Sequence, residues 1–160
     1  MKYADIRNSI KSGDTLAWTH RKLRSWYDFK VMLVRLFQMS EYSHVGIAIV
    51  LAGRVWVLES VTPHPRFVPL SNLLPCYLVT DAALTDEQVE RGLSYVGRED
   101  YDYSQWEAVK AYFNKNDPTD KSIQCAEFVN MIHERLWKAT PSAVVGRLLE
   151  NGSSLQELHL

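Results

Sequence analysis

The segment from His44 to Ser60 constrains the fold more than any other part of the chain. His44 to Leu51 reads HVGIAIVL and Val55 to Ser60 reads VWVLES, and both stretches are rich in β-branched residues. Ala52-Gly53-Arg54 lies between them and is suited to a turn. Two such stretches joined by a glycine-containing turn predict a β-hairpin.

Three further short strands are expected around this hairpin. Ser12-Gly13-Asp14 is typical of a turn, and it precedes a predicted strand over Thr15 to Trp18. Arg66 to Leu70 and Cys76 to Thr80 are the other two predicted strands. Nearby prolines restrict these two to edges or strand ends, because proline has no N–H to donate to a sheet.

The remaining pattern predicts helices. Residues 20–39 have apolar side chains at helical spacing, and Thr85 with Gln88 forms a capping box at the start of another helix. Further helices are expected at Tyr101 to Phe113, from Gln124 to about Lys138, and from Thr140-Pro141 onward. After a turn at 151–154, the last residues are expected to form a short tail.

Length and composition favour one packed domain over residues 1–160. The chain has 160 residues, of which 46% are hydrophobic, and no long linker divides it. Its net charge of -1 gives no electrostatic reason to expect a nucleic-acid partner. The sequence has neither an apolar run long enough to span a membrane nor the apolar core of a signal peptide. We therefore expect a cytoplasmic location by default, while a virion component or a protein released by lysis stays possible.

Cys125 is the strongest candidate for a reactive group. It begins the predicted helix at 124, and Phe128, Val129 and Ile132 follow on the same, inward face. The positive end of a helix favours the thiolate form of a cysteine, and unpaired N–H groups there can hold an oxyanion. The alternative is a buried small apolar residue, which is the role expected of Cys76.

His44 and Glu59 are candidate partners of this thiol. A cysteine hydrolase needs an imidazole near the sulfur to carry its proton, and His44 begins a strongly β segment. If the hairpin turns at Ala52-Gly53, Gly46 faces Glu59, and His44 lies diagonally opposite Glu59 on the same face, about 7–8 Å away at Cα. The Glu59 carboxylate would then orient the imidazole. The alternative for His44 is a place in the core or on the surface without a catalytic role. The alternative for Glu59 is a position in water at the end of the strand.

Taken in order, five motifs resemble the permuted papain-like amidases, the YiiX/YaeF-like branch of the NlpC superfamily. The motifs are Gly13-Asp14, Tyr42-Ser43-His44-Val45-Gly46-Ile47, Val57-Leu58-Glu59-Ser60, Gly97 with Tyr101-Asp102-Tyr103, and Gln124-Cys125-Ala126-Glu127-Phe128-Val129. The resemblance spans roughly residues 12 to 150. It implies an α+β, circularly permuted papain-like (NlpC-like) fold, in which a small antiparallel sheet or partial barrel packs against helices.

The resemblance also implies a function. Cys125 would be the nucleophile, His44 the base and Glu59 the orienting residue of a cysteine-dependent hydrolase that cleaves an amide bond through an acyl-enzyme. The expected partners are a peptide, a peptidoglycan fragment or a lipid. Tentative substrate-binding residues are Asp14, Ser43, Tyr101 and Tyr103.

Two alternatives to an amidase stay open. The first is a lipid-directed thioesterase, phospholipase or acyltransferase that uses the same cysteine and histidine, since residues 20–39 form a basic amphipathic pattern. The second is a non-catalytic structural or interaction domain. No cofactor is expected, and no paired ligand spacing supports a metal site.

Overall fold

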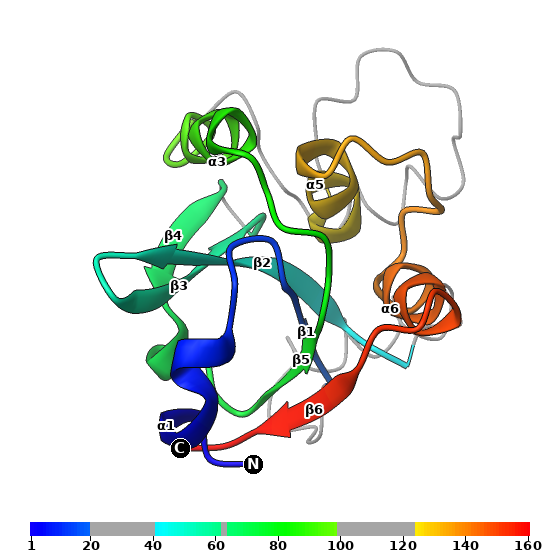
Figure 1. The fold of residues 1–160 in the computed structure, drawn as a ribbon. Helices are drawn as coiled ribbons and strands as arrows, with labels where there is room; N and C mark the ends of the chain where they lie inside the picture. Colours follow the sequence, from blue (N-terminus) through cyan, green and yellow to red (C-terminus); the bar gives the residue numbers. More distant parts are fainter. Residues whose placement is uncertain (20–40, 62–63, 99–123) are drawn as a thin grey trace, which may run out of the picture.

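A single antiparallel sheet forms the centre of the structure, which is a computed structural model describing residues 1–19, 41–61, 64–98 and 124–160. Within these residues the strand order is β4-β3-β2-β1-β5-β6 (Figure 1). The strands are β1 Thr15–Trp18, β2 His44–Leu51, β3 Arg54–Glu59, β4 Arg66–Pro69, β5 Cys76–Val79 and β6 Leu155–Leu158.

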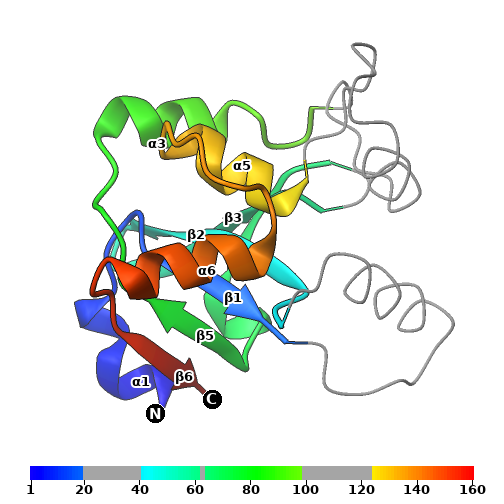
Figure 2. The same ribbon diagram turned by 90° about the vertical axis from the view of Figure 1, so that its right-hand side faces the viewer.

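Helices α3, α5 and α6 lie together on one side of the sheet (Figure 2). The described helical elements are α1 Tyr3–Ile6, α3 Asp86–Leu93, α5 Cys125–Ile132 and α6 Pro141–Glu150, with short 3-10 helices at Arg7–Ser9 and Leu70–Asn72. The predicted capping box is confirmed, because the Thr85 hydroxyl accepts from Gln88 N and the Gln88 side chain accepts from Thr85 N. Thr140 likewise caps α6 by accepting from Ala143 N at 3.3 Å. None of the described helices is both long and apolar enough to cross a bilayer.

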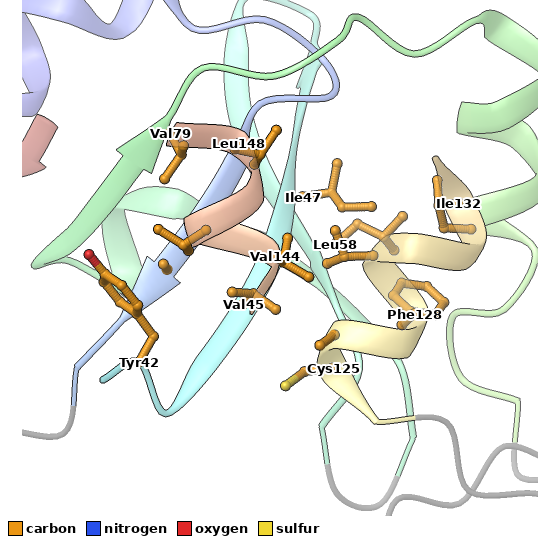
Figure 3. Packing of buried hydrophobic residues seen from close by; sticks show 14 of the residues in the cluster. Tyr42, Val45, Ile47, Leu58, Val79, Cys125, Phe128, Ile132, Val144 and Leu148 are labelled. Atoms are coloured by element: carbon orange, nitrogen blue, oxygen red, sulfur yellow. The ribbon is translucent and has the colours of Figure 1, made fainter. Parts of the chain in front are cut away.

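The hydrophobic core has two parts, one on each face of the sheet. On the helical side, Ile47 and Leu58 pack with Phe128 and Ile132 of α5 (Figure 3). On the other face, Leu16, Ala48 and Val57 are among the buried residues. Burying a side chain the size of Phe128 stabilises a fold by about 1.5–3 kcal/mol, so this packing fixes α5 firmly against β2 and β3.

The β2–β3 hairpin has the predicted register. Val50 pairs with Val55, and Ile47 pairs with Leu58. The turn uses positive φ angles of 51° at Ala52 and 71° at Gly53, which glycine adopts at no steric cost. One further step along the same ladder brings Gly46 opposite Glu59, and a Cβ at Gly46 would lie 3.1 Å from the Glu59 Cβ.

Two sequence expectations are wrong. The helix beginning at Cys125 ends at Ile132 and not near Lys138, because Glu134 takes a φ of 58° and Arg135 turns back to bind Asp81. The last residues are not a tail: Leu155–Leu158 pairs with β5 as strand β6. The helices predicted at 20–39 and 101–113 lie outside the described residues, while the expected strands at Thr15, Arg66 and Cys76 are confirmed as β1, β4 and β5.

Candidate active site

Cys125 occupies the first turn of α5, and its neighbours on the helix hold it in place. Phe128 and Val129 are fully buried and anchor the helix against the sheet, so the thiol is held beside β2. The helix start is fixed by a bond from Gln124 N to the Glu127 carboxylate at 2.9 Å. Figure 3 shows the Cys125 sulfur at this end of the helix, and the residue as a whole is 5% exposed. The cysteine is therefore both fixed in position and largely removed from water.

His44 begins strand β2 and lies next to this thiol. The start of β2 and the N-terminal end of α5 are on the same side of the molecule (Figure 2). The imidazole is hydrogen-bonded to the Cys125 side chain. Its other face meets the Trp18 ring, with centroids 5.4 Å apart and planes at 40°. Trp18 is itself fixed by a 2.7 Å bond from its indole N–H to Leu73 O, so the imidazole is held between a fixed ring and the thiol.

Glu59 ends strand β3, and its carboxylate contacts the Nε2 atom of the imidazole. The His44 Nε2 and Glu59 Oε2 atoms are 2.5 Å apart. The Glu59 side chain is only 2% exposed. Burying a carboxylate is costly unless it is paired and hydrogen-bonded, and the imidazole meets part of that requirement. The expectation that Glu59 and His44 share a face of the hairpin is confirmed, and the alternative of a glutamate in water at the strand end is wrong.

The surroundings of His44 favour its protonated form. Desolvation lowers the pKa of His44, but the charge and hydrogen bond of Cys125, with those of Glu59, outweigh it and raise the pKa to about 10. Burial acts to raise the pKa of Glu59, but the hydrogen bond and charge of His44 and the charge of Arg66 lower it below its ordinary value. The arrangement thus stabilises an imidazolium at His44 next to a carboxylate at Glu59.

Arg66 is a site residue that the sequence did not reveal. It stands directly opposite Glu59 in the β3–β4 ladder. Its Nε donates to Glu59 Oε1 at 2.7 Å, and a second guanidinium nitrogen lies 2.7 Å from the same oxygen. The β4 strand was predicted, but its pairing partner was not, so no signal placed Arg66 next to Glu59. Trp18 was missed for the same reason, since its pairing with His44 depends on the β1–β2 register.

The tentative substrate-binding residues do not all gather here. Asp14 is buried at the far end of β1, where its carboxylate accepts from Lys11 N and Asp81 N. Its backbone oxygen bonds Ala48 N, four residues and about 13 Å along β2 from His44. The Asp14 carboxylate therefore holds a turn and does not adjoin His44.

Ser43 does adjoin His44, but its hydroxyl and its backbone N–H both donate to Trp18 O, at 3.0 and 2.8 Å. Tyr101 and Tyr103 lie outside the described residues. Cys76 is buried as expected, and burial raises the pKa of its thiol to about 12. Desolvation causes that shift, whereas His44 lies beside Cys125.

Comparison with known proteins shows a likeness of fold. No family model and no curated protein matches the sequence. Among solved structures, the chain is similar to the crystal structure of the metalloprotein YiiX from Escherichia coli O157:H7, with a TM-score of 0.51 and 18% sequence identity. The match covers 78% of this chain and 64% of the YiiX chain, so this chain spans less than two thirds of that protein. The fold is therefore α+β and YiiX-like.

Proposed function

We propose that this protein is a cysteine-dependent hydrolase that cleaves an amide bond in a peptide or cell-wall peptide through an acyl-enzyme on Cys125. One observation supports this most strongly. The His44 imidazole hydrogen-bonds the Cys125 side chain and also lies 2.5 Å from a buried Glu59 carboxylate. A nucleophile, a base and a group that orients the base, each in reach of the next, form the usual arrangement for nucleophilic catalysis.

The proposed reaction begins with a proton transfer from the Cys125 thiol to His44. Because Glu59 engages Nε2, the ring nitrogen left for the thiol is Nδ1. The thiolate attacks the substrate carbonyl carbon and forms a C–S bond, and the carbonyl electrons move to its oxygen. The carbonyl then re-forms as the C–N bond breaks, and the His44 imidazolium gives its proton to the departing amine.

Water completes the cycle. His44 takes a proton from a water molecule, and the resulting hydroxide attacks the thioester carbon. The C–S bond breaks, the acid product leaves, and the thiolate–imidazolium pair is restored. The backbone N–H groups of Cys125 and Ala126, the first two of α5, have no partner within the helix, so they are available to stabilise the oxyanion near Cys125. Glu59 supports the imidazolium throughout and does not itself take the proton.

A metal does not enter this proposal. YiiX is a metalloprotein, which raises the question of whether this chain has the ligands for a metal site. In the described parts of the chain, no three His, Cys, Asp or Glu side chains form a group able to hold an ion. Structural and catalytic zinc sites use three or four such ligands, and the residues described here do not fit one.

The lipid-directed alternative rested on the basic pattern of residues 20–39. Those residues lie outside the described part of the chain, so no structural observation favours lipid over peptide. The amide substrate is proposed because Glu59 and the Cys125-Ala126-Glu127-Phe128 motif resemble the amidase branch, and lipid esters serve as a comparison in the test.

The test is mass spectrometry of the intact protein after incubation with peptides, peptidoglycan fragments and lipid esters. The proposal predicts an acyl adduct that maps to Cys125 and that hydroxylamine removes. His44→Ala should not form it, and Cys76→Ser should form it normally. An adduct from lipid esters alone would replace the amidase proposal with the lipid alternative. Absence of any adduct with all three substrate classes would contradict a hydrolase of this kind.

A further inference from the structure

The Glu59 carboxylate has two oxygens, and only one of them faces His44. Oε2 lies 2.5 Å from His44 Nε2, while Oε1 accepts from Arg66 Nε at 2.7 Å. The two partners come from different strands, β2 and β4, on either side of β3. The carboxylate is therefore held from both sides, and its position beside the imidazole depends on both bonds.

We propose that Arg66 is a positioning residue, which acts through Glu59 to hold the His44 imidazole. The site is then a chain of four side chains, in the order Cys125, His44, Glu59 and Arg66. This inference rests on the proposed function for its catalytic meaning. The Arg66 guanidinium bonds the Glu59 carboxylate, and through that carboxylate it acts on the imidazole. Its role is to fix the carboxylate in its orientation and in its charged form.

The geometry of the Arg66 contact suits this role. Two guanidinium nitrogens converge on the same oxygen, both at 2.7 Å, so rotation of the carboxylate would break both contacts. The Arg66 side chain is 45% exposed, whereas that of Glu59 is 2% exposed. The arginine thus keeps part of its own hydration while it neutralises a carboxylate that has almost none. A buried carboxylate left with one unpaired oxygen would pay a desolvation penalty.

The consequence is a pH dependence that belongs to Glu59. The groups that act on its charge are His44 from β2 and Arg66 from β4, while α5 presents the Cys125 thiol to His44. A positive neighbour favours the carboxylate over the acid, so removal of Arg66 lets Glu59 take up a proton at a higher pH. Protonated Glu59 no longer supports the imidazolium, and His44 then no longer activates Cys125. Arg66 therefore extends Cys125 reactivity toward acid pH.

The experiment measures the rate of Cys125 alkylation by iodoacetamide against pH, from about pH 4 to 8, in the full chain. Arg66→Gln removes the charge, and Arg66→Lys keeps the charge but not the two-nitrogen contact. Arg54→Gln is the matched control, because Arg54 is an exposed arginine on the same strand as Glu59, five residues and about 17 Å away. Circular dichroism at each pH confirms that every variant is folded.

We expect Arg66→Gln to shift the acid side of the rate profile upward by about one pH unit, the low end of the effect of a nearby charge because Arg66 is partly in water. At the acid pH values of that limb, Cys125 in Arg66→Gln is alkylated about tenfold more slowly than in wild type. Near pH 8 the rate in Arg66→Gln approaches the wild-type rate. The pH profile of Arg66→Lys should lie between those of wild type and Arg66→Gln, and the profile of Arg54→Gln should match wild type. An unshifted profile in Arg66→Gln, or an equal loss at every pH, would overturn the proposal.

A second readout separates this inference from the proposed function. Titration of the Glu59 side-chain carboxyl by carbon NMR reports its pKa without any reactivity at Cys125. If wild-type Cys125 alkylates no faster than Cys76, the proposed function fails, but a raised Glu59 pKa in Arg66→Gln still supports the link between the two side chains. If Cys125 is reactive and the Glu59 titration is unchanged, the proposed function survives and the role of Arg66 is rejected.

Discussion

His44 Nε2 lies 2.5 Å from Oε2 of Glu59, a carboxylate that is 2% exposed and that comes from the neighbouring strand of one hairpin. The turn at Ala52-Gly53 sets this contact, because it fixes the register that brings both side chains to one face. Gly46, directly opposite Glu59, leaves the space through which the glutamate reaches. A local turn therefore determines the orientation of the imidazole beside Cys125.

Replacement of Glu59 by glutamine should lower the pKa of His44. The charge and the hydrogen bond of Glu59 both favour the imidazolium, and the amide keeps the shape but not the charge. A two-dimensional NMR titration of the imidazole nitrogens measures the change. Glu157→Gln is the control: Glu157 lies 3.6 Å from His159, in a pair that is not part of the site, and its loss should leave the His44 titration unmoved. An unchanged His44 pKa in Glu59→Gln would remove Glu59 from the proposed site.

His133 should make the protein less stable as the pH falls from 7 to 5. Burial lowers the pKa of His133 to about 4, the nearby Asp81 and Arg135 acting in opposite directions, while an unfolded histidine titrates at its ordinary value of 6.5. Between these two values the unfolded chain binds more protons, so the free energy of unfolding rises with pH. The loss that His133 alone causes from pH 7 to pH 5 is about 2 kcal/mol.

Urea denaturation at several pH values tests this, with His133→Asn as the comparison. The histidine ring bonds the backbone of Gly13, and its Nε2 atom is buried without a hydrogen-bond partner in the described structure. Asparagine can keep the donor but does not titrate, so the variant should lose about 2 kcal/mol less than the wild type between pH 7 and pH 5. His44, whose pKa is raised, acts in the opposite direction, but it is present in both proteins and cancels from this difference. Glu59 does not interfere, because a carboxylate whose pKa is lowered loses its stabilising effect only below its ordinary value of 4.5. An identical slope in both proteins would show that His133 is not the titrating group.

Arg135→Met should destabilise the fold by about 3 kcal/mol, because it leaves a buried charge without its partner. Arg135 donates from two nitrogens to the Asp81 carboxylate, which also accepts from Thr15 Oγ1 at 2.8 Å, and the Asp81 side chain is 1% exposed. Arg147→Met is the control: Arg147 pairs with Glu150 on the surface of α6, and exposed pairs contribute less than about 1 kcal/mol. Chemical denaturation measures both. Equal losses in the two variants would mean that the Asp81 contact does not hold the end of α5 to the sheet.

The parts of this fold that were predictable from sequence depend on local patterns. The turn and the β-branched stretches fix the β2–β3 register, which is why His44 and Glu59 could be placed on one face. Thr85 and Thr140 mark helix starts because their side chains bond backbone N–H groups only a few residues away.

The parts that were missed depend on contacts between distant segments. Helix α5 ends early because Arg135 binds Asp81, 54 residues away in the chain. Residues Leu155–Leu158 form a strand because they pair with the edge of β5. No local sequence pattern predicts this pairing. Arg66 and Trp18 reach the site through sheet pairings that the sequence did not specify. The contact between His44 and Glu59 was therefore predictable, but the side chains that hold these two residues were not.

The rate of alkylation of Cys125 relative to Cys76 tests the central claim most directly. Wild-type protein is treated with iodoacetamide at pH 6.5, and peptide mass spectrometry follows each cysteine. Because the His44 imidazolium lies beside the Cys125 sulfur, while burial raises the pKa of Cys76 to about 12, Cys125 should react at least about 10²-fold faster. His44→Ala should remove most of that difference in a folded protein. Equal rates for the two cysteines in folded wild-type protein, or an undiminished Cys125 rate in His44→Ala, would contradict the account.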